Sequence, residues 1–476
     1  MDGSRLQPID IGDFVLDKTK SSRQSAVFHG VRERIIDGLW AKGGKLPSTR
    51  KFASELGISR NTVILAYEQL VAEGYITSVK SSGYYVSVDL PEHYLIQTSP
   101  QTHTPHLPEF EPNLNKAFAP GEPALNLFPY TKWQRLLQRH VSRDFIAGNR
   151  SVQGDANLRH AISDYLSSSR SVVCNPSRVI ITSGAQQAMI IALMSVLKPQ
   201  DKVLMENPGY AQMRKSLNLL NMQLEPLSVK EKSGPSMTDI TSSEAQALYL
   251  TPSNQYPMGT TLNTEQRLKI IEWAYQNERW VIEDDYDSEF QFAHRPYTSM
   301  QGLAGKIGHD DRVLYVGSFS KIMFNGLRLG YLVVPEQLVP RCLEIKDALS
   351  GDSPSHTQAA LADFIMEGDL LRHIRKMRRT YKIKYHAMIE AIERTFGGRV
   401  QVISQPAGLH VTLKWENGIN ETVWCERALE LGIIIRPLTY YESQKGDRSW
   451  HGAVLGFGNV PLEDIDRLIN KLATVF

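Results

Sequence analysis

The sequence predicts an α/β protein with two folded parts, a small N-terminal winged helix-turn-helix and a large domain built on a mostly parallel sheet. Two patterns predict this fold class. Helix-forming segments followed by two short β-prone runs stand at the start of the chain, and from about residue 119 onward apolar runs alternate with helical segments. The length agrees with a division into domains, because 476 residues exceed what one ordinary domain holds.

The composition narrows the class of protein. Hydrophobic residues make up 42% of the chain and charged residues 22%, which is typical of a soluble globular protein. The net charge is only +2, so any affinity for nucleic acid must come from a local patch. The three cysteines form no close pair, which favours a reducing cytoplasm and predicts neither a disulfide framework nor a zinc site. No signal-peptide pattern stands at the start, and no apolar run approaches the roughly twenty residues of a membrane span. We therefore expect a cytoplasmic protein without a membrane segment.

Residues 21–88 are expected to form the winged helix-turn-helix, preceded by an extension over residues 1–20. Apolar residues at helical spacing predict a first helix over residues 25–39. Ser48 and Ser59 are each placed to cap a further helix, and Gly57 allows the tight turn between these two helices. The second helix of such a pair enters the DNA major groove with its N-terminal residues.

Two β-prone runs, residues 75–79 and 84–86, predict a hairpin wing after the third helix. Lysine and glycine at its tip suit close approach to a phosphate backbone. The predicted partner of this domain is a double-stranded DNA operator, although a helical domain that only supports a dimer is an alternative. The candidate DNA-contacting residues are Arg50, Ser59, Arg60, Asn61, Thr62, Lys80 and Gly83.

Residues 89–118 are rich in Pro, Ser, Thr and Gln and predict an extended connector without a core of its own. Such a connector would let the winged helix move relative to the large domain at residues 119–476. In that domain five apolar runs predict buried strands, at residues 178–181, 202–205, 247–250, 280–282 and 312–316. Ligands of such sheets lie at the carboxyl ends of the strands.

Polar residues that suit pyridoxal 5'-phosphate (PLP) follow these runs. Lys321 provides an amine for a Schiff base, and Asp284 is placed to face a protonated pyridine nitrogen. Tyr286 is placed to reach the ring hydroxyl, and serine and arginine side chains that follow the run at residues 312–316 suit the phosphate. A metal site or a solvated acidic cluster is the alternative for the acidic residues 283–285.

Two further turns end at the same edge of the predicted sheet. The small residues 182–188 open a helix, whose free N–H groups and dipole favour a phosphate. Tyr210 follows the turn at residues 206–209 and is placed either to stack on a flat ring or to pack in the core.

The N-terminal motifs at residues 45–50, 56–63, 66–67 and 73–75 resemble the GntR superfamily of bacterial regulators. The later motifs resemble fold-type I aminotransferases, with further matches at residues 127–129, 158–159, 251–253, 326–331 and 373–378. Nearly the whole chain is similar to the MocR-type regulators, which fuse a GntR winged helix to that fold. The resemblance implies a smaller C-terminal α/β subdomain and a homodimer with sites near the subunit interface.

The resemblance also implies a role for each candidate residue. Lys321 would form the internal aldimine, while Asp284 would meet the pyridine nitrogen. Tyr286 would contact the ring oxygen and Tyr210 would stack on the ring. The residues that would hold the phosphate are Ala185, Gln186, Ser318, Ser320 and Arg328.

Three positions depart from the pattern. Asn254 stands where the regulators usually have histidine, and Tyr256 stands where aminotransferases often have asparagine. Val454 occupies the position of the arginine that grips the substrate carboxylate in amino-acid aminotransferases, and an uncharged residue cannot make that bidentate bond. Arg436 and Arg214 are candidate replacements, or else surface or structural charges.

These observations predict a transcription regulator that senses PLP, or captures an amine effector, through an aldimine at Lys321. The absent arginine favours PLP itself as the signal, and thus control of vitamin B6 metabolism, with little or no transaminase activity. The rival is a genuine aminotransferase whose winged helix only regulates its own gene. A third reading is a regulator that has lost PLP binding, which the presence of Lys321, Asp284 and Arg328 together opposes.

Overall fold

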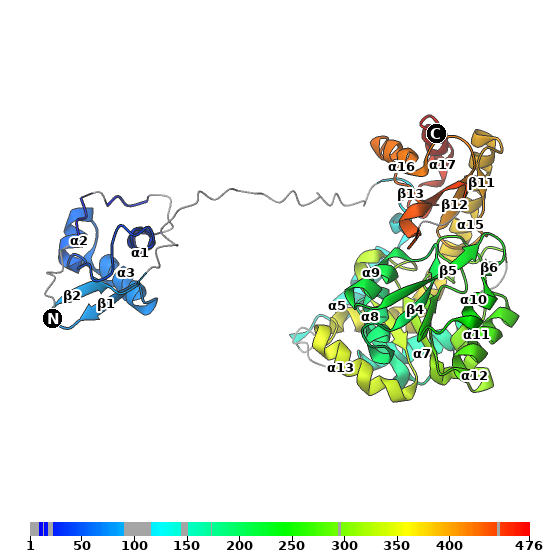
Figure 1. The fold of residues 1–476 in the computed structure, drawn as a ribbon, viewed down its shortest axis with the longest axis horizontal. Coiled ribbons are helices and arrows are strands. Elements are labelled where there is room, and N and C mark those ends of the chain that lie inside the picture. Colours follow the sequence, from blue (N-terminus) through cyan, green and yellow to red (C-terminus); the bar gives the residue numbers. More distant parts are fainter. Residues whose placement is uncertain are drawn as a thin grey trace. The chain divides into compact units, whose positions relative to one another are not determined.

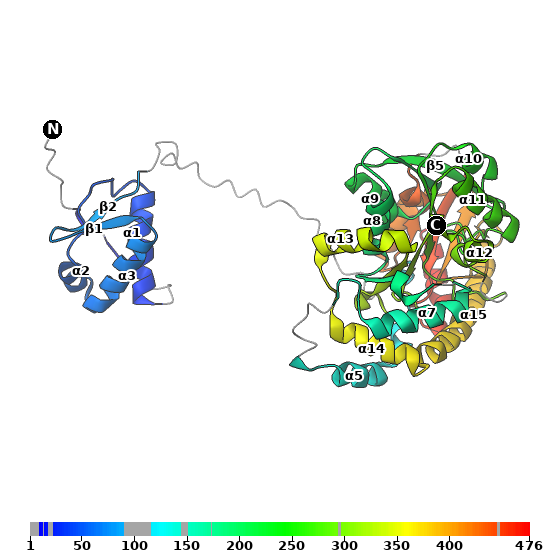
Figure 2. The ribbon, with the colours of Figure 1, turned by 90° about the horizontal axis from the view of Figure 1, so that it is seen from below.

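The computed structural model describes residues 9–12, 14–17, 22–89, 116–143, 151–172, 174–293, 297–444 and 448–476. The chain divides into two compact units, residues 1–110 and residues 111–476. Figures 1 and 2 show the elements of each unit. Most of the connector predicted at residues 89–118 lies outside the described residues.

The first unit is a winged helix-turn-helix, as predicted. Its elements are α1 (Arg23–Ile36), α2 (Thr49–Leu56), α3 (Arg60–Ala72) and the antiparallel hairpin of β1 (Ile76–Val79) and β2 (Gly83–Val86). Ser48 caps α2 by accepting a hydrogen bond from the N–H of Lys51, and Ser59 caps α3 by accepting one from the N–H of Asn61. The turn between the two helices passes through Gly57, whose φ of 61° suits glycine.

The first helix is shorter than its apolar pattern predicts. It ends at Ile36, and the predicted core residue Leu39 is 71% exposed, while the neighbouring Trp40 is buried. The chain turns at Gly38, which has a φ of 73°, so helical spacing no longer applies beyond it. Phe14, within the predicted extension, packs against Trp40 and Phe52, so part of that extension belongs to the core of this unit.

The second unit is built on an eight-stranded sheet. The strands, in spatial order, are β3 (Val179–Thr182), β10 (Gly330–Val333), β9 (Val313–Ser318), β8 (Trp280–Asp285), β7 (Ala247–Leu250), β4 (Lys202–Asn207), β5 (Gln223–Lys230) and β6 (Gly234–Pro235). The five central strands β9, β8, β7, β4 and β5 are parallel, whereas β10 is antiparallel to both of its neighbours. All five strands predicted from the sequence are present.

Helices cover both faces of this sheet (Figures 1 and 2). Side chains alternate along a strand, so neighbouring residues of β3 face opposite sides of the sheet. Ile180 packs with α8 (Ala185–Val196), α9 (Ala211–Leu219) and α13 (Val339–Ser350). Its neighbour Ile181 faces the opposite side. That side is covered by α5 (Tyr130–Arg139), α7 (Ala156–Arg170), α10 (Met237–Ser242), α11 (Thr264–Gln276), α12 (Met300–Ile307) and α14 (Ser355–Met366).

A smaller C-terminal subdomain follows the long helix α15 (Asp369–Phe396). Its four strands pair in the order β11 (Gln401–Val402), β12 (His410–Trp415), β14 (His451–Gly456) and β13 (Arg436–Pro437), all antiparallel. Helices α15, α16 (Glu421–Glu430) and α17 (Ile465–Ala473) share a core with this sheet, centred on Trp415 and Trp424. In neither unit does a described helix have the length and apolarity to cross a membrane.

Candidate functional site

All nine residues predicted to bind the cofactor line one cavity of about 350 Å³ in the second unit. The cavity lies at the carboxyl ends of β4, β7, β8 and β9, where ligands of parallel sheets bind. The small subdomain contributes a further part of the wall, including His410 from β12 and Arg436 from β13, and the loop at residues 119–122 contributes another. The nine are Ala185, Gln186, Tyr210, Asp284, Tyr286, Ser318, Ser320, Lys321 and Arg328.

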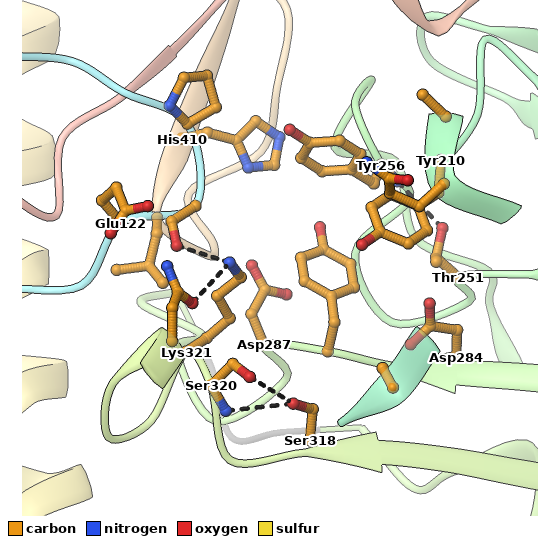
Figure 3. A pocket seen from close by; sticks show the side chains of 18 of the residues that line it. Glu122, Tyr210, Thr251, Tyr256, Asp284, Asp287, Ser318, Ser320, Lys321 and His410 are labelled. Carbon is orange, nitrogen blue, oxygen red and sulfur yellow. Dashed lines mark hydrogen bonds between the residues drawn. The ribbon is translucent and has the colours of Figure 1, made fainter. Parts of the chain in front are cut away.

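Lys321 follows the end of β9 and directs its amine into the cavity (Figure 3). Its Nζ donates hydrogen bonds to the carbonyl oxygen of Gly121 at 2.6 Å and to Oδ1 of Asn325 at 3.4 Å. Burial lowers the pKa of Lys321, although the carboxylates of Glu122 and Asp287 oppose this effect. A lowered pKa makes the neutral, nucleophilic amine more accessible.

Asp284 faces the cavity from the side opposite Lys321 (Figure 3). One carboxylate oxygen, Oδ2, accepts a hydrogen bond from the hydroxyl of Tyr249 at 2.6 Å. The other, Oδ1, is buried and has no hydrogen-bond partner in the part of the chain that the structure describes. Burial raises the pKa of Asp284 to about 7.

The two acidic neighbours of Asp284 point away from it, because side chains alternate along β8. Glu283 accepts hydrogen bonds from the backbone N–H groups of Met300 and Gln301, both at 2.9 Å, at the start of α12. Asp285 forms a buried ion pair with Arg170, with 2.7 Å between Oδ2 and Nε. The three carboxylates therefore do not converge, and the described residues contain no group of three side chains that could hold a metal ion.

The serines and Arg328 lie at one end of the cavity, beside the start of α8. The hydroxyl of Ser318 lies 3.0 Å from that of Ser320, and Nη2 of Arg328 donates to the carbonyl oxygen of Ser183 at 2.8 Å. Gly184 precedes α8 with a φ of 93°, and a Cβ there would lie only 3.3 Å from the guanidinium of Arg328. This end combines free N–H groups of a helix start with two hydroxyls and a cation, which suits a phosphate.

Tyrosines form much of the remaining wall. Tyr286 donates to the backbone oxygen of Asn254 at 3.0 Å, and the hydroxyls of Tyr256 and Tyr441 lie 2.9 Å apart. Tyr210 lines the cavity and also packs against the core beneath α8, so both predicted roles of this side chain remain compatible with its position. Asn254 does not reach into the cavity wall, since its Nδ2 donates to both carboxylate oxygens of Asp287 at 3.1 Å.

The two candidate replacements for the missing arginine have different surroundings. Val454 is fully buried in β14, and Arg436 on β13 is its cross-strand partner and lines the cavity. Arg214 instead donates to the backbone oxygens of Tyr440, at 2.9 Å, and Glu442. Arg214 therefore has a structural role, whereas Arg436 is a charge of the cavity itself.

These surroundings fit PLP. The unpaired buried oxygen of Asp284 suits the protonated ring nitrogen, the amine of Lys321 lies across the cavity from it, and the end near Arg328 suits the phosphate. A Cβ at Gly121 would lie 2.7 Å from the Nζ of Lys321, so glycine leaves room for the lysine at this point.

Sequence reasoning missed several residues of the site. Tyr249 supports Asp284 from the neighbouring strand, and Gly121, Glu122 and Asn325 surround the amine of Lys321. A hydroxyl within the otherwise apolar run of residues 247–250 was the signal for Tyr249, because a buried tyrosine needs a partner. The loop at residues 121–122 carried no comparable signal, since it reaches Lys321 from 200 positions away in the chain.

The candidate DNA-contacting residues lie at the starts of α2 and α3 and in the hairpin of the first unit. Arg60 and Asn61 are exposed at the start of α3, Arg50 is exposed at the start of α2, and Lys80 is exposed at the tip of the hairpin. The remaining three, Ser59, Thr62 and Gly83, are positioned beside them, and the hydroxyl of Ser59 is engaged as the cap of α3.

Comparisons with known proteins agree with this architecture. Residues 23–86 match the family of bacterial regulatory proteins, gntR family, and residues 122–467 match the family aminotransferase class I and II. The chain is 34% identical, over 94% of its length and 93% of the relative's, to the probable rhizopine catabolism regulatory protein MocR of Rhizobium meliloti. It is 27% identical, over 90% of each chain, to the pyridoxine biosynthesis transcriptional regulator PdxR of Corynebacterium glutamicum.

Solved structures resemble the second unit. The α-aminoadipate aminotransferase LysN of Thermus thermophilus superposes with a TM-score of 0.69 at 24% identity, over 75% of this chain and 91% of that one. This likeness shows a fold-type I aminotransferase fold. The chain therefore belongs to the MocR-type transcriptional regulators, in which a GntR-type winged helix is joined to an aminotransferase class I and II domain.

Proposed function

We propose that this regulator binds PLP in the cavity of its second unit, at Lys321, and that PLP or an amine that reacts with it controls binding of the winged helix to DNA. When bound, PLP supplies an aldehyde carbon that condenses with an amine and releases water. Lys321 provides that amine from the protein, and its lowered pKa favours the neutral form that the reaction requires.

The buried carboxylate oxygen of Asp284, which has no partner among the described residues, carries this proposal. A buried carboxylate oxygen without a partner is costly, and a protonated ring nitrogen would satisfy it. The hydroxyl of Tyr249 holds Asp284 in place by donating a hydrogen bond to the other carboxylate oxygen, Oδ2. Gln186 and Ala185 present the start of α8 to the phosphate, together with Arg328.

The DNA side of the proposal rests on the exposed residues of the winged helix. Arg60 and Asn61 at the start of α3 are proposed to reach the major groove, and Lys80 at the hairpin tip is proposed to contact a phosphate. We further propose a homodimer as the DNA-binding form, which suits an operator with two half-sites.

Two kinds of effector are compatible with this mechanism, namely PLP itself and a small amine. The printed name of the relative PdxR refers to pyridoxine biosynthesis, which supports control of vitamin B6 supply as one proposal. The presence of Arg436 in the cavity wall supports an amine that carries a negative charge.

The test is DNA binding to the region upstream of the protein's own gene, measured by fluorescence anisotropy at fixed salt, with and without PLP. We expect a change in affinity with PLP that is lost in Lys321→Ala, which also loses the absorption of the lysine-bound cofactor. Lys306→Ala, an exposed lysine on α12, is the matched control and should behave as the wild type.

A second assay distinguishes the proposed function from its rival, a genuine aminotransferase with an autoregulatory winged helix. Steady production of a keto acid from an amino donor, at ordinary aminotransferase rates, would support the rival. DNA binding that is indifferent to PLP and to Lys321→Ala would contradict the proposed sensing mechanism.

A further inference from the structure

Asp287 is a second buried carboxylate of the cavity, two residues beyond the end of β8. Its side chain lines the cavity, and the residue is only 2% exposed. Figure 3 shows the carboxylate beside the amine of Lys321, with which it interacts electrostatically. The fit of the cavity to PLP assigns no role to Asp287, because the ring nitrogen is met by Asp284 and the phosphate by the end near Arg328.

The structure holds the carboxylate of Asp287 in a fixed orientation. Both of its oxygens accept a hydrogen bond from Nδ2 of Asn254, each at 3.1 Å. Glycine at position 408 leaves room for this carboxylate, since a Cβ there would lie 2.3 Å from its Oδ2. A charge that is already fixed in place needs little reorganisation to stabilise an opposite charge.

The carboxylate of Asp287 has no cation in direct contact. Among the residues that the structure describes, none forms an ion pair with it, and its hydrogen-bond donor Asn254 is a neutral amide. Burial raises the pKa of Asp287, while the hydrogen bond from Asn254 and the charge of Lys321 oppose this effect. Lys321 is therefore the cation that favours the ionised form of Asp287.

Two other carboxylates near Asp287 are engaged elsewhere. Asp285 forms its ion pair with Arg170, and Glu289 accepts a hydrogen bond from the hydroxyl of Tyr165 at 2.6 Å. Neither Asp285 nor Glu289 lines the cavity. Both are therefore held away from the amine of Lys321, which Asp287 faces.

The remaining titratable groups beside Asp287 are neutral. Burial raises the pKa of Tyr256 and of Tyr286, so both hydroxyls keep their protons near neutral pH. Burial lowers the pKa of His410, on the opposite wall, to about 4, so its imidazole carries no charge at that pH. None of these three groups competes with Asp287 for the charge of Lys321.

Glu122 is the other carboxylate that acts on Lys321, and its effect on the free amine precedes that of Asp287. Glu122 lies in the loop at residues 119–122 and is half-buried, whereas Asp287 is almost fully buried. Water and salt screen a half-buried charge more strongly than a buried one. The two carboxylates can therefore be told apart by the salt dependence of their effects.

We infer that Asp287 is the counter-ion of Lys321 and stabilises positive charge on the lysine nitrogen when Lys321 is bonded to the cofactor. This inference rests on the proposed function, because it concerns the nitrogen that would hold PLP. Positive charge on that nitrogen withdraws electrons from the carbon bonded to it, which favours attack by an incoming amine. The incoming nitrogen then forms a C=N bond and passes one proton to the lysine nitrogen, whose own bond to the carbon breaks, so that Lys321 leaves as a neutral amine.

The experiment varies the pH of full-length, PLP-loaded protein and follows the absorption of the lysine-bound cofactor, which changes when the lysine nitrogen loses its proton. The variants are Asp287→Asn, Asn254→Ala and Glu122→Gln. The matched control is Asp164→Asn, at an exposed aspartate on α7. Each titration is made at low and at high salt, because salt screens exposed charges more than buried ones.

We expect Asp287→Asn to lower the pKa of the lysine nitrogen by roughly 1 to 3 pH units at both salt concentrations, because a nearby buried opposite charge is removed. Asn254→Ala should lower this pKa by less, since the carboxylate loses its hydrogen-bond donor and binds a proton more readily. Glu122→Gln should lower it at low salt only. Asp164→Asn should titrate as the wild type does.

The same pKa in Asp287→Asn and in the wild type would overturn the inference, as would a change that appears in Glu122→Gln alone. Circular dichroism reports whether each variant is folded. If Asp287→Asn is not, Asn254→Ala decides, because it keeps the carboxylate, and an unchanged pKa in that variant would overturn the inference. A wild type that never shows the absorption of the lysine-bound cofactor would contradict the proposed function, and the inference with it.

Discussion

At the scale of single residues, adjacent carboxylates of one strand have different roles because the pleat turns them to opposite faces. Glu283 accepts hydrogen bonds from backbone N–H groups and Asp285 pairs with Arg170, so both carboxylates are engaged within the domain. Asp284 has one carboxylate oxygen in the cavity that no described residue pairs with, which is unfavourable until a ligand binds there. A functional group and its structural neighbours thus occupy consecutive positions.

We expect Asp284→Asn to stabilise the cofactor-free protein at high pH. Burial raises the pKa of Asp284 from 3.8 to about 7, so folding favours the protonated carboxyl. The protonated carboxyl makes its full contribution to the free energy of unfolding below about pH 4, and this contribution is lost as the pH rises through 7. Because asparagine does not ionise, the variant should gain roughly 3 kcal/mol over the wild type between pH 5 and pH 8.

Thermal unfolding of both cofactor-free proteins at the two pH values measures this gain. Glu244→Gln, at an exposed acid, is the control and should follow the wild type. The same Asp284→Asn variant should bind PLP more weakly, because asparagine lacks the negative charge that stabilises a protonated ring nitrogen. Parallel pH profiles for Asp284→Asn and the wild type would show that this carboxyl is not the titrating group.

At the scale of elements, the start of α3 contributes both to the stability of the winged helix and to its predicted recognition of DNA. Ser59 ends the tight turn and caps the helix, and the two residues after it, Arg60 and Asn61, are exposed. The cap orders the backbone from which these side chains project. The Nε of Arg60 donates to Oγ1 of Thr49 at 3.3 Å, which places its guanidinium between α2 and α3.

Arg60→Ala should weaken operator binding by about 1–3 kcal/mol, because it removes a cation at the predicted groove-facing end of α3. Fluorescence anisotropy at fixed salt measures the loss, and the absorption of bound PLP should stay unchanged. Lys42→Ala is the control, since Lys42 is exposed near the base of the hairpin and pairs with Asp89. An unaltered affinity in Arg60→Ala would mean that α3 is not the recognition helix.

Ser59→Ala should lower the stability of the winged helix by about 1 kcal/mol, because the N–H of Asn61 loses its capping oxygen. Ser59→Asp should retain the wild-type stability, since aspartate caps helices as well as serine does. Circular dichroism during thermal unfolding reports the stability. If Ser59 also contacts DNA, Ser59→Asp will keep the stability but bind the operator more weakly, as its negative charge faces phosphate.

At the scale of the whole molecule, the two units have separate hydrophobic cores. The core of the first unit contains residues from Phe14 to Val86, and every described core of the second unit begins at Ala117 or later. Separate cores allow each unit to unfold in its own transition.

PLP should therefore raise the unfolding temperature of one transition only. A ligand present at 100 times its Kd stabilises the folded state that binds it by about 2.7 kcal/mol. Differential scanning calorimetry with and without PLP measures the two transitions, and Lys321→Ala should reduce the shift. A PLP-induced shift of both transitions would instead reveal coupling between the units in the absence of DNA.

The sequence alone determined the features that depend on local patterns. Capping serines and Gly57 predicted α2 and α3, and apolar runs predicted five strands with the site at their ends. Local patterns failed where the chain turned sharply, as they did for Leu39 beyond Gly38. Most of the nine cavity residues lie at or just after the end of an apolar run or at the start of a helix, and the resemblance to fold-type I aminotransferases supplied their expected roles.

The tertiary structure decided which charges meet. Arg214 and Arg436 were equivalent in the sequence, and only the pairing of β13 with β14, and of α9 with the segment after β13, separates a structural arginine from one in the cavity. Likewise the unpaired oxygen of Asp284 depends on Tyr249 in another strand. Such contacts arise from strand register and from segments far apart in the chain, which no local spacing of residues encodes.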